Sequence, residues 1–287
     1  MFLLAPAVVF AGVGASWLKV PVAPRSAALG EATVAWPVLG DAAWVNPAGL
    51  AGARQGVGFV HGRWIADIRS TAFEGRKRTA RGTLLLFGDV VNVPGLERRV
   101  TASAEPLGTF SVHQLQAGAG FGSVFRGAVA VGLAAKWIYE KIHLVDGGTV
   151  ALDFGVATVK PVAGFRLGAS IRNLGPGYKL GSDTVDLPAT ISVGLNRNVG
   201  LLGRADALRA WMAWRKIRGE DSHFALGAEL RLPGGLDLRA GYQSGYESRG
   251  VSLGAGLRLG RARLDYALVP FQNDLGQAHL VGLGYRL

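Results

Sequence analysis

Few residues of this 287-residue chain have both the type and the spacing that catalysis requires. The histidines are scattered, and Ser111 and His113, which could imitate the nucleophile and base of an esterase, fall in an alternating apolar and polar segment. Cysteine is absent, which excludes thiol catalysis, disulfides and Cys-ligated metals. No His, Asp and Glu residues have the spacing of metal ligands. We therefore expect no enzyme, no catalytic residue, no metal site and no cofactor.

Charged side chains that occur singly within alternating segments are more informative. Because successive side chains of a strand point to opposite faces, these residues share the polar face of their strands. We expect that face to line an interior, where the two signs pair across the lumen and pack it; a path for charged solutes is the alternative. The predicted lumen charge network consists of Lys136, Glu140, Asp153, Arg166, Arg172, Glu229, Arg231, Asp237, Arg239, Arg258, Arg263 and Asp265.

The formal net charge of +11 and the pI near 10.4 raise the question of a nucleic-acid partner. A nucleic-acid binder gathers its basic residues on one face or arm, with aromatic residues between them. Apart from short runs such as Arg76-Lys77-Arg78, most basic residues here stand singly within alternating segments. We therefore expect no nucleic-acid partner.

From about Gly56 onward, apolar residues recur at every second position, which is typical of strands with one apolar face. Most such segments run nine residues or more, long enough for a tilted strand to cross hydrocarbon. The sequence therefore predicts an all-β fold, a transmembrane antiparallel β-barrel of about 14 strands. Their expected starts lie near residues 55, 64, 80, 108, 126, 147, 163, 188, 206, 221, 235, 249, 262 and 277.

The same alternation would fit a soluble barrel whose apolar face points inward. Three features favour a membrane barrel: the polar face is rich in glycine, both signs of charge interleave along it, and aromatic residues such as Trp137 and Tyr285 lie toward strand ends. Short and long connections also alternate, with long loops expected from Val90 to Leu107 and from Leu174 to Leu187. We expect a protein of the bacterial outer membrane, in contact with its lipid.

Two stretches precede the barrel, which is expected over residues 55–287. Residues 1–15 have the length of a signal-peptide core and end in small residues, so we expect a signal-peptide remnant; a buried apolar segment is the alternative. Residues 16–54 are expected to form an N-terminal plug or hatch segment inside or under the barrel.

Several motifs resemble the PorV/PorQ family of bacterial outer-membrane proteins. Arg25-Ser26-Ala27-Ala28-Leu29-Gly30 is similar to the family's "R-x-x-A-x-G" stretch, and Trp44-Val45-Asn46-Pro47-Ala48-Gly49-Leu50 is similar to its "W-N-P-A-G-L" motif. The segment 264–271 resembles its penultimate strand, and the C-terminal segment 282–287 is similar to an outer-membrane insertion signal.

The resemblance implies a FadL-like barrel and a tight plug turn at Asn46, Pro47, Ala48 and Gly49. The local chemistry agrees, because Pro47 disfavours the helical conformation for Asn46. The resemblance also implies that the protein binds or shuttles secreted cargo and works with the translocon of a type IX-like secretion system. We expect the barrel to be a monomer or a subunit of a larger complex. The alternative is a FadL-like transporter for hydrophobic small molecules, with Trp36, Trp44 and Phe59 as walls of a hydrophobic pocket.

Overall fold

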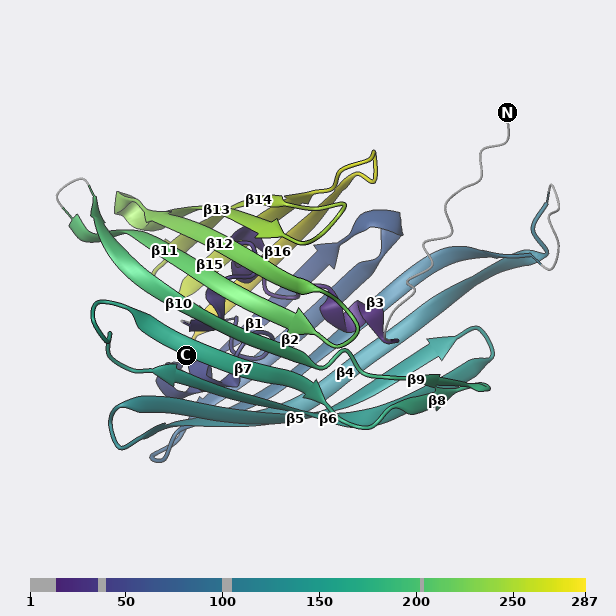
Figure 1. Ribbon diagram of the computed structural model, residues 1–287, viewed down its shortest axis with the longest axis horizontal. Helices are drawn as coiled ribbons and strands as arrows, with labels where there is room; N and C mark the ends of the chain where they lie inside the picture. Colours follow the sequence, from purple (N-terminus) through teal and green to yellow (C-terminus); the bar gives the residue numbers. More distant parts are fainter. Residues whose placement is uncertain (1–13, 36–39, 100–104, 202–203) are drawn as a thin grey trace.

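The computed structural model describes residues 14–35, 40–99, 105–201 and 204–287. Within them, fourteen antiparallel strands close into a barrel, and a two-stranded hairpin of β8 (Tyr178–Leu180) and β9 (Asp183–Val185) lies beside it (Figure 1). The barrel strands are β1 (Gly56–Arg63), β2 (Arg69–Arg78), β3 (Thr83–Arg98), β4 (Gly108–Phe125), β5 (Val129–Ile142), β6 (Val145–Thr158), β7 (Arg166–Leu174), β10 (Thr190–Leu201), β11 (Arg204–Ile217), β12 (Ser222–Arg231), β13 (Leu236–Ser244), β14 (Val251–Leu259), β15 (Ala262–Pro270) and β16 (Gln277–Arg286).

This architecture confirms the predicted all-β barrel of about fourteen strands. One expectation is wrong: the stretch from Val90 to Arg98 is not a loop, because β3 continues through it and Arg98 pairs with Gly108 of β4. The ladder there contains an irregularity between Val93 and Leu96. Pro94 and Gly95 resemble a loop in sequence, but a β-bulge accommodates both residues within a strand.

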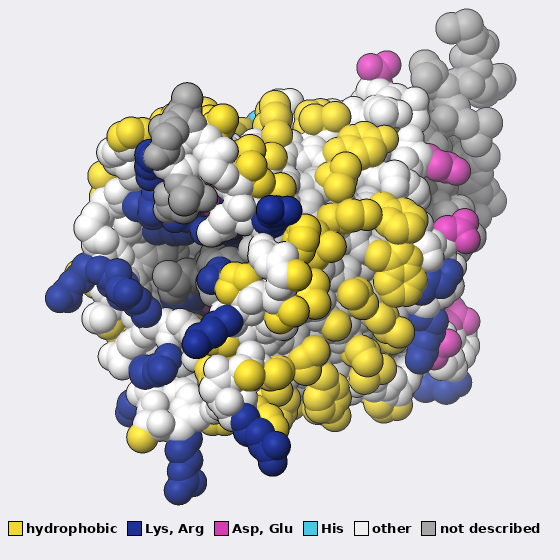
Figure 2. Space-filling model, turned by 60° about the vertical axis from the view of Figure 1, so that its left-hand side comes forward, with side chains coloured by type: hydrophobic (Ala, Val, Ile, Leu, Met, Phe, Trp, Pro, Cys, Tyr) yellow, Lys and Arg dark blue, Asp and Glu magenta, His cyan; other side chains and the backbone are white. Residues whose placement is uncertain are grey.

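The outer face of the barrel is apolar. On β5, Val131, Leu133 and Trp137 are exposed, whereas Ala134 and Lys136, which alternate with them, are buried. The other barrel strands show the same alternation, and Figure 2 shows the resulting band of hydrophobic side chains. A closed barrel has no unpaired strand edge, so this band can face hydrocarbon without exposing backbone polar groups.

The two ends of the barrel differ in the length of their connections. At the end where β1 begins and β16 ends, strands are joined by turns such as 126–128 and 260–261, and we name it the short-turn end. At the opposite, long-loop end lie the connections 99–107 and 175–189, the latter carrying β8 and β9. In outer-membrane barrels the short turns are periplasmic and the long loops extracellular.

The N-terminal segment, residues 14–35 and 40–54, runs inside the barrel from one end to the other (Figure 1). Trp17 and Leu18 pack beside the β8–β9 hairpin at the long-loop end, and Ala53 meets Arg78 and Thr83 at the short-turn end. The segment contains η1 (Ser16–Lys19), α1 (Pro24–Ala28), η2 (Thr33–Ala35) and η3 (Pro47–Gly52); η4 (Ile65–Asp67) and η5 (Pro233–Gly235) belong to turns of the barrel. None of the described helices is long and apolar enough to cross a membrane.

The outward band allows a direct test of the lipid-facing side. Leu226 is 52% exposed in the middle of β12, so we expect Leu226→Arg to lower the free energy of unfolding in lipid by about 2–4 kcal/mol. Leu144→Arg is the matched control, because Leu144 is exposed in the β5–β6 turn at the long-loop end. Folding in lipid vesicles, followed by heat-modifiable migration under denaturant, measures both. Equal stability of the two variants would contradict the orientation.

Candidate functional site

A belt of glycines on the inner face of the wall receives the N-terminal segment. Each belt glycine lies where a side chain would collide with or press against that segment, so the segment approaches the wall at backbone distance. The contacts follow the chain around the barrel: Pro24 at Gly282 of β16, Ala28 at Gly254 of β14, Leu29 at Gly241 of β13 and Gly227 of β12, Val34 at Gly194 of β10, Ala35 at Gly168 of β7, Asn46 at Gly155 of β6, Pro47 at Gly132 of β5 and Leu50 at Gly122 of β4.

The belt gives a physical reason for much of the glycine on the polar face of the strands. A strand normally loses stability from glycine, because glycine adds backbone entropy to the unfolded chain and has no side chain to pack. Here glycine is needed because only a residue without a Cβ leaves room for the N-terminal segment. The segment and the wall are therefore fitted to each other along most of the circumference.

Gly132 offers a test of this fit. We expect Gly132→Val to displace the Pro47–Ala48 peptide, since an added Cβ would collide with the Pro47 carbonyl. The expected result is faster proteolytic cleavage within residues 40–54 of the folded protein. Gly284→Val is the matched control, because that strand glycine has open space around its Cβ position. Equal protection in both variants would show that the segment does not depend on the belt.

Asn46 holds the predicted turn to the wall. Its side chain is fully buried, and its Oδ1 accepts a hydrogen bond from the Ala48 N–H at 3.0 Å, which begins η3 at Pro47. The Nδ2 group lies within hydrogen-bonding distance of three carbonyl oxygens, those of Val34 (2.8 Å), Val156 (3.2 Å) and Ala169 (3.3 Å). The Gly49 N–H donates to the Asn46 carbonyl at 3.1 Å. One side chain thus connects the N-terminal segment to both β6 and β7.

The wall between β6 and β7 is irregular beside this contact. Their register shifts between Leu152 and Phe154, and Asp153 takes the place of a backbone partner by accepting the Asn173 N–H at 2.6 Å. Asn173 has a φ of 59°, a left-handed conformation that asparagine tolerates better than most residues. The two strands are therefore joined here partly by side chains.

An apolar groove of about 430 Å³ crosses the outer wall over β4, β5, β6 and β7. Its lining includes the exposed side chains of Val131, Leu133, Phe154, Val156 and Ile171, together with Gly132 and Gly155. The same two glycines touch Pro47 and Asn46 on the inner side. At these positions only the backbone of the wall separates the lipid-facing groove from the N-terminal segment.

The structure places the predicted charged residues on the inner face and brings most of them into two groups. In the first, Lys136 pairs with Asp153 at 2.7 Å, Glu140 accepts from Gln114 and Tyr178, and Arg172 donates to the Trp44 carbonyl. Arg166 is half-buried at the start of β7. The second group is a chain of ion pairs along β12 to β15, in which each residue has a group of opposite charge within 4 Å: Glu229, Arg231, Asp237, Arg239, Arg258, Arg263 and Asp265.

Two residues that the sequence analysis did not place among the lumen charges connect the N-terminal segment to them. Arg25 of α1 is buried and pairs with Asp41 at 2.7 Å and with Glu229 at 3.0 Å. Glu31 pairs with Arg215 of β11 at 2.8 Å and lies 3.5 Å from Arg249. Burial alone would raise the pKa of Glu31, but these cations lower it to about 2, so Glu31 is a carboxylate at neutral pH. Neither residue lies in an alternating segment, so no periodicity indicated it.

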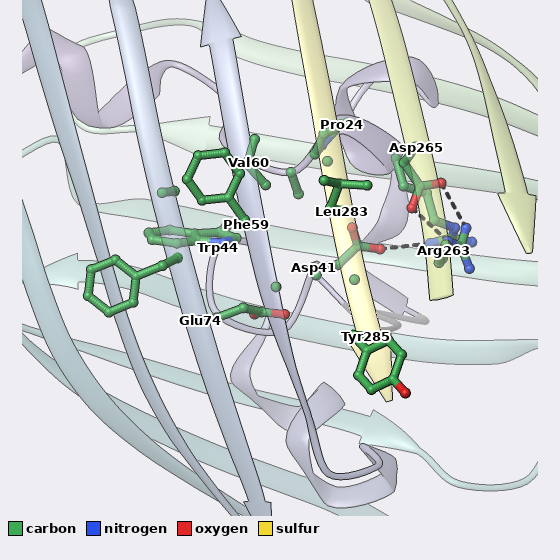
Figure 3. A pocket seen from close by; sticks show the side chains of 18 of the residues that line it. Pro24, Asp41, Trp44, Phe59, Val60, Glu74, Arg263, Asp265, Leu283 and Tyr285 are labelled. Atoms are coloured by element: carbon green, nitrogen blue, oxygen red, sulfur yellow. Dashed lines mark hydrogen bonds and ion pairs between the residues drawn. The ribbon is translucent and has the colours of Figure 1, made fainter. Parts of the chain in front are cut away.

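A second cavity, of about 70 Å³, lies where the N-terminal segment meets β1, β2 and β16 (Figure 3). Trp44 lines it from inside and packs edge-on against Phe87 at 5.1 Å. Phe59, which was predicted with Trp44 as a pocket wall, also borders this cavity, but from the outer face of β1, where alternation turns its ring outward, 47% exposed. Trp36 lies outside the described residues. Asp41, Arg263 and Asp265 give one side of the cavity a charged lining.

The described residues contain no cluster of His, Asp and Glu side chains that could hold a metal ion. Fourteen strands, a closed ladder and an outward apolar band define the class of this protein: it is an outer-membrane β-barrel whose lumen holds its own N-terminal segment.

Solved structures with the same fold include two aromatic-hydrocarbon transporters. The toluene transporter TbuX of Ralstonia pickettii is 14% identical, with a TM-score of 0.67 over 93% of this chain and 98% of its own. The P. putida toluene transporter TodX is 11% identical, with a TM-score of 0.65 over 94% and 99%. A Pseudomonas aeruginosa FadL homologue is 12% identical, with a TM-score of 0.60 over 96% and 100%. No protein-family model matches the chain, and no curated protein matches it in sequence.

Proposed function

We propose that this barrel carries small hydrophobic molecules across the outer membrane by a lateral route through the β6–β7 wall. The observation that carries the proposal is the apolar groove outside this wall, which meets the Asn46–Pro47 turn through Gly132 and Gly155. A hydrophobic solute released there would enter lipid directly. It would avoid the aqueous phase, and exposure of apolar surface to water is unfavourable.

An axial path is less suited to such a solute. The lumen contains the N-terminal segment and the charge groups centred on Glu229 and Asp153, which an apolar molecule cannot hydrogen-bond. Passing these charges would require separating buried ion pairs, whose separation is costly. The irregular β6–β7 junction offers a shorter path out of the lumen than the axial one. Its side-chain hydrogen bonds can open without breaking a continuous ladder of backbone hydrogen bonds.

The transporters of similar fold support this proposal over the secretion hypothesis. TbuX and TodX are named as toluene transporters and align with nearly the whole chain. The resemblance of the N-terminal motifs to the PorV/PorQ family has no counterpart in these comparisons. Secreted cargo and a translocon are therefore not part of the proposed function, and toluene is the first solute to test.

The test is uptake of radiolabelled toluene by a bacterial host with and without this barrel. We expect faster uptake with the wild-type protein, and a several-fold reduction for Ala169→Trp, which fills the groove at β7. Val281→Trp is the matched control, because Val281 faces lipid on β16, away from the groove. No gain over the host alone would contradict transport of toluene. Equal uptake by the two variants would contradict the lateral route.

A further inference from the structure

The surface charge of the barrel is divided between its two ends. Among the side chains that the structure describes, the exposed acidic residues lie at the long-loop end: Asp67, Glu97, Glu105, Asp146, Asp183, Asp186, Asp221, Glu247 and Asp274. Exposed basic residues at that end offset them, including Arg63, Arg69, Arg98, Arg99, Lys141, Lys179, Lys216 and Arg218. The surface excess of positive charge therefore lies at the other end.

The short-turn end carries exposed basic residues from connections around the barrel. In Figure 2 this end is turned forward and shows a concentration of Lys and Arg side chains, whereas the acidic side chains lie mainly toward the opposite end. We name these residues the basic rim: Arg54, Lys77, Arg81, Arg126, Lys160, Arg197 and Arg261. Among the described residues, none of the seven forms an ion pair.

The basic rim borders the apolar band directly. Phe125 is 58% exposed and precedes Arg126, and Leu259 is 61% exposed two residues before Arg261. The Arg126 guanidinium lies over the Phe125 ring, 5.3 Å from its centroid. Basic side chains beside an apolar band occupy the level at which lipid headgroups begin, and their long stems reach from the apolar layer toward water.

We propose that the basic rim binds the anionic headgroups of phospholipids in the leaflet at the short-turn end. The distribution of the basic rim around the barrel favours lipid, and not an acidic protein, as its binding partner. A protein partner meets one face, whereas Lys77 and Arg81 flank β2–β3, Arg126 lies at β4–β5, Lys160 at β6–β7 and Arg261 at β14–β15. A ring of this kind matches the annular lipid layer that surrounds every strand.

The experiment compares lipid binding by three proteins in mixed micelles of phosphatidylglycerol and phosphatidylethanolamine. The rim variant carries Lys77→Gln, Arg81→Gln, Arg126→Gln, Lys160→Gln and Arg261→Gln. The control carries the same number of neutralisations at the opposite end: Arg69→Gln, Arg98→Gln, Lys141→Gln, Lys179→Gln and Arg218→Gln. Native mass spectrometry counts the lipids retained by each, and heat-modifiable migration verifies that all three are folded.

We expect the wild type and the control to retain phosphatidylglycerol preferentially, and the rim variant to lose that preference, by up to about fivefold per neutralised side chain. Added salt should weaken the wild-type preference, because it screens exposed charges. The proposal is overturned if the rim variant keeps the wild-type preference or if the control loses as much. If the rim bound an acidic protein and not lipid, the rim variant would keep the wild-type lipid preference, which would also overturn the proposal. Toluene uptake is not involved, so this test is independent of the transport proposal.

Discussion

Replacing Glu229 with alanine is expected to lower the free energy of unfolding by about 3–5 kcal/mol, the typical cost of removing one partner from a buried ion pair. Glu229 is 2% exposed, and its Oε2 accepts hydrogen bonds from Arg25 at 3.0 Å and from Arg239 at 2.9 Å. Arg209 and Arg231 lie within 4 Å of its Oε1. Alanine would leave these cations concentrated in the lumen with one carboxylate fewer.

The measurement is urea unfolding of the barrel in lipid vesicles, followed by tryptophan fluorescence. Glu229→Gln keeps the volume and an acceptor oxygen but removes the charge, so its loss of stability should lie between those of wild type and Glu229→Ala. Glu247→Ala is the surface control: Glu247 is exposed at the long-loop end, where substitutions of this kind change stability by less than about 0.5 kcal/mol. If Glu229→Ala matches this control, the network does not stabilise the fold.

The same prediction bears on the N-terminal segment. Arg25 pairs with Asp41 within the segment and with Glu229 on the wall, so loss of Glu229 removes one of its two ion pairs. We therefore expect Glu229→Ala to increase proteolysis of residues 40–54 before the barrel itself unfolds. A protected segment in this variant would mean that the glycine belt holds the segment without the charges.

The strands could be predicted from sequence because each carries its own evidence. A period of two is a local property, and the lipid on one side and the filled lumen on the other maintain it along most of each strand. Expected starts such as 108, 262 and 277 coincide with those of β4, β15 and β16. The loop expected from Val90 was wrong near Pro94 because the local composition there resembles a loop, although pairing with β4 continues on both sides.

The path of the N-terminal segment could not be predicted in this way. Its course depends on which glycine of the wall faces which of its residues, and contacts such as Ala35 with Gly168 join positions far apart in sequence. The roles of Arg25 and Glu31 arise from the same long-range contacts. For Asn46, the following proline predicted the turn, but the contacts of its side chain with the Val156 and Ala169 carbonyls form only because the segment lies inside the barrel.

Replacing Asn46 with alanine is expected to release the turn from the β6–β7 wall. The substitution removes the cap of η3 and leaves the carbonyls of Val34, Val156 and Ala169 without this donor. Each buried group left without a partner costs about 1–3 kcal/mol. Under the proposed function, the Asn46–Pro47 turn, which lies against the inner side of Gly155, restricts passage from the lumen to the groove. We therefore expect Asn46→Ala to increase toluene uptake and to lower the free energy of unfolding.

A second variant can separate this gating effect from general loosening of the segment. Glu229→Ala removes one of the two ion pairs of Arg25 and is expected to loosen the N-terminal segment, but it leaves the contacts of Asn46 with β6 and β7 in place. If toluene uptake rises in Asn46→Ala but not in Glu229→Ala, the restriction lies at the Asn46 turn. An equal rise in both variants would show that loosening of the whole segment, and not release of the turn, opens the path.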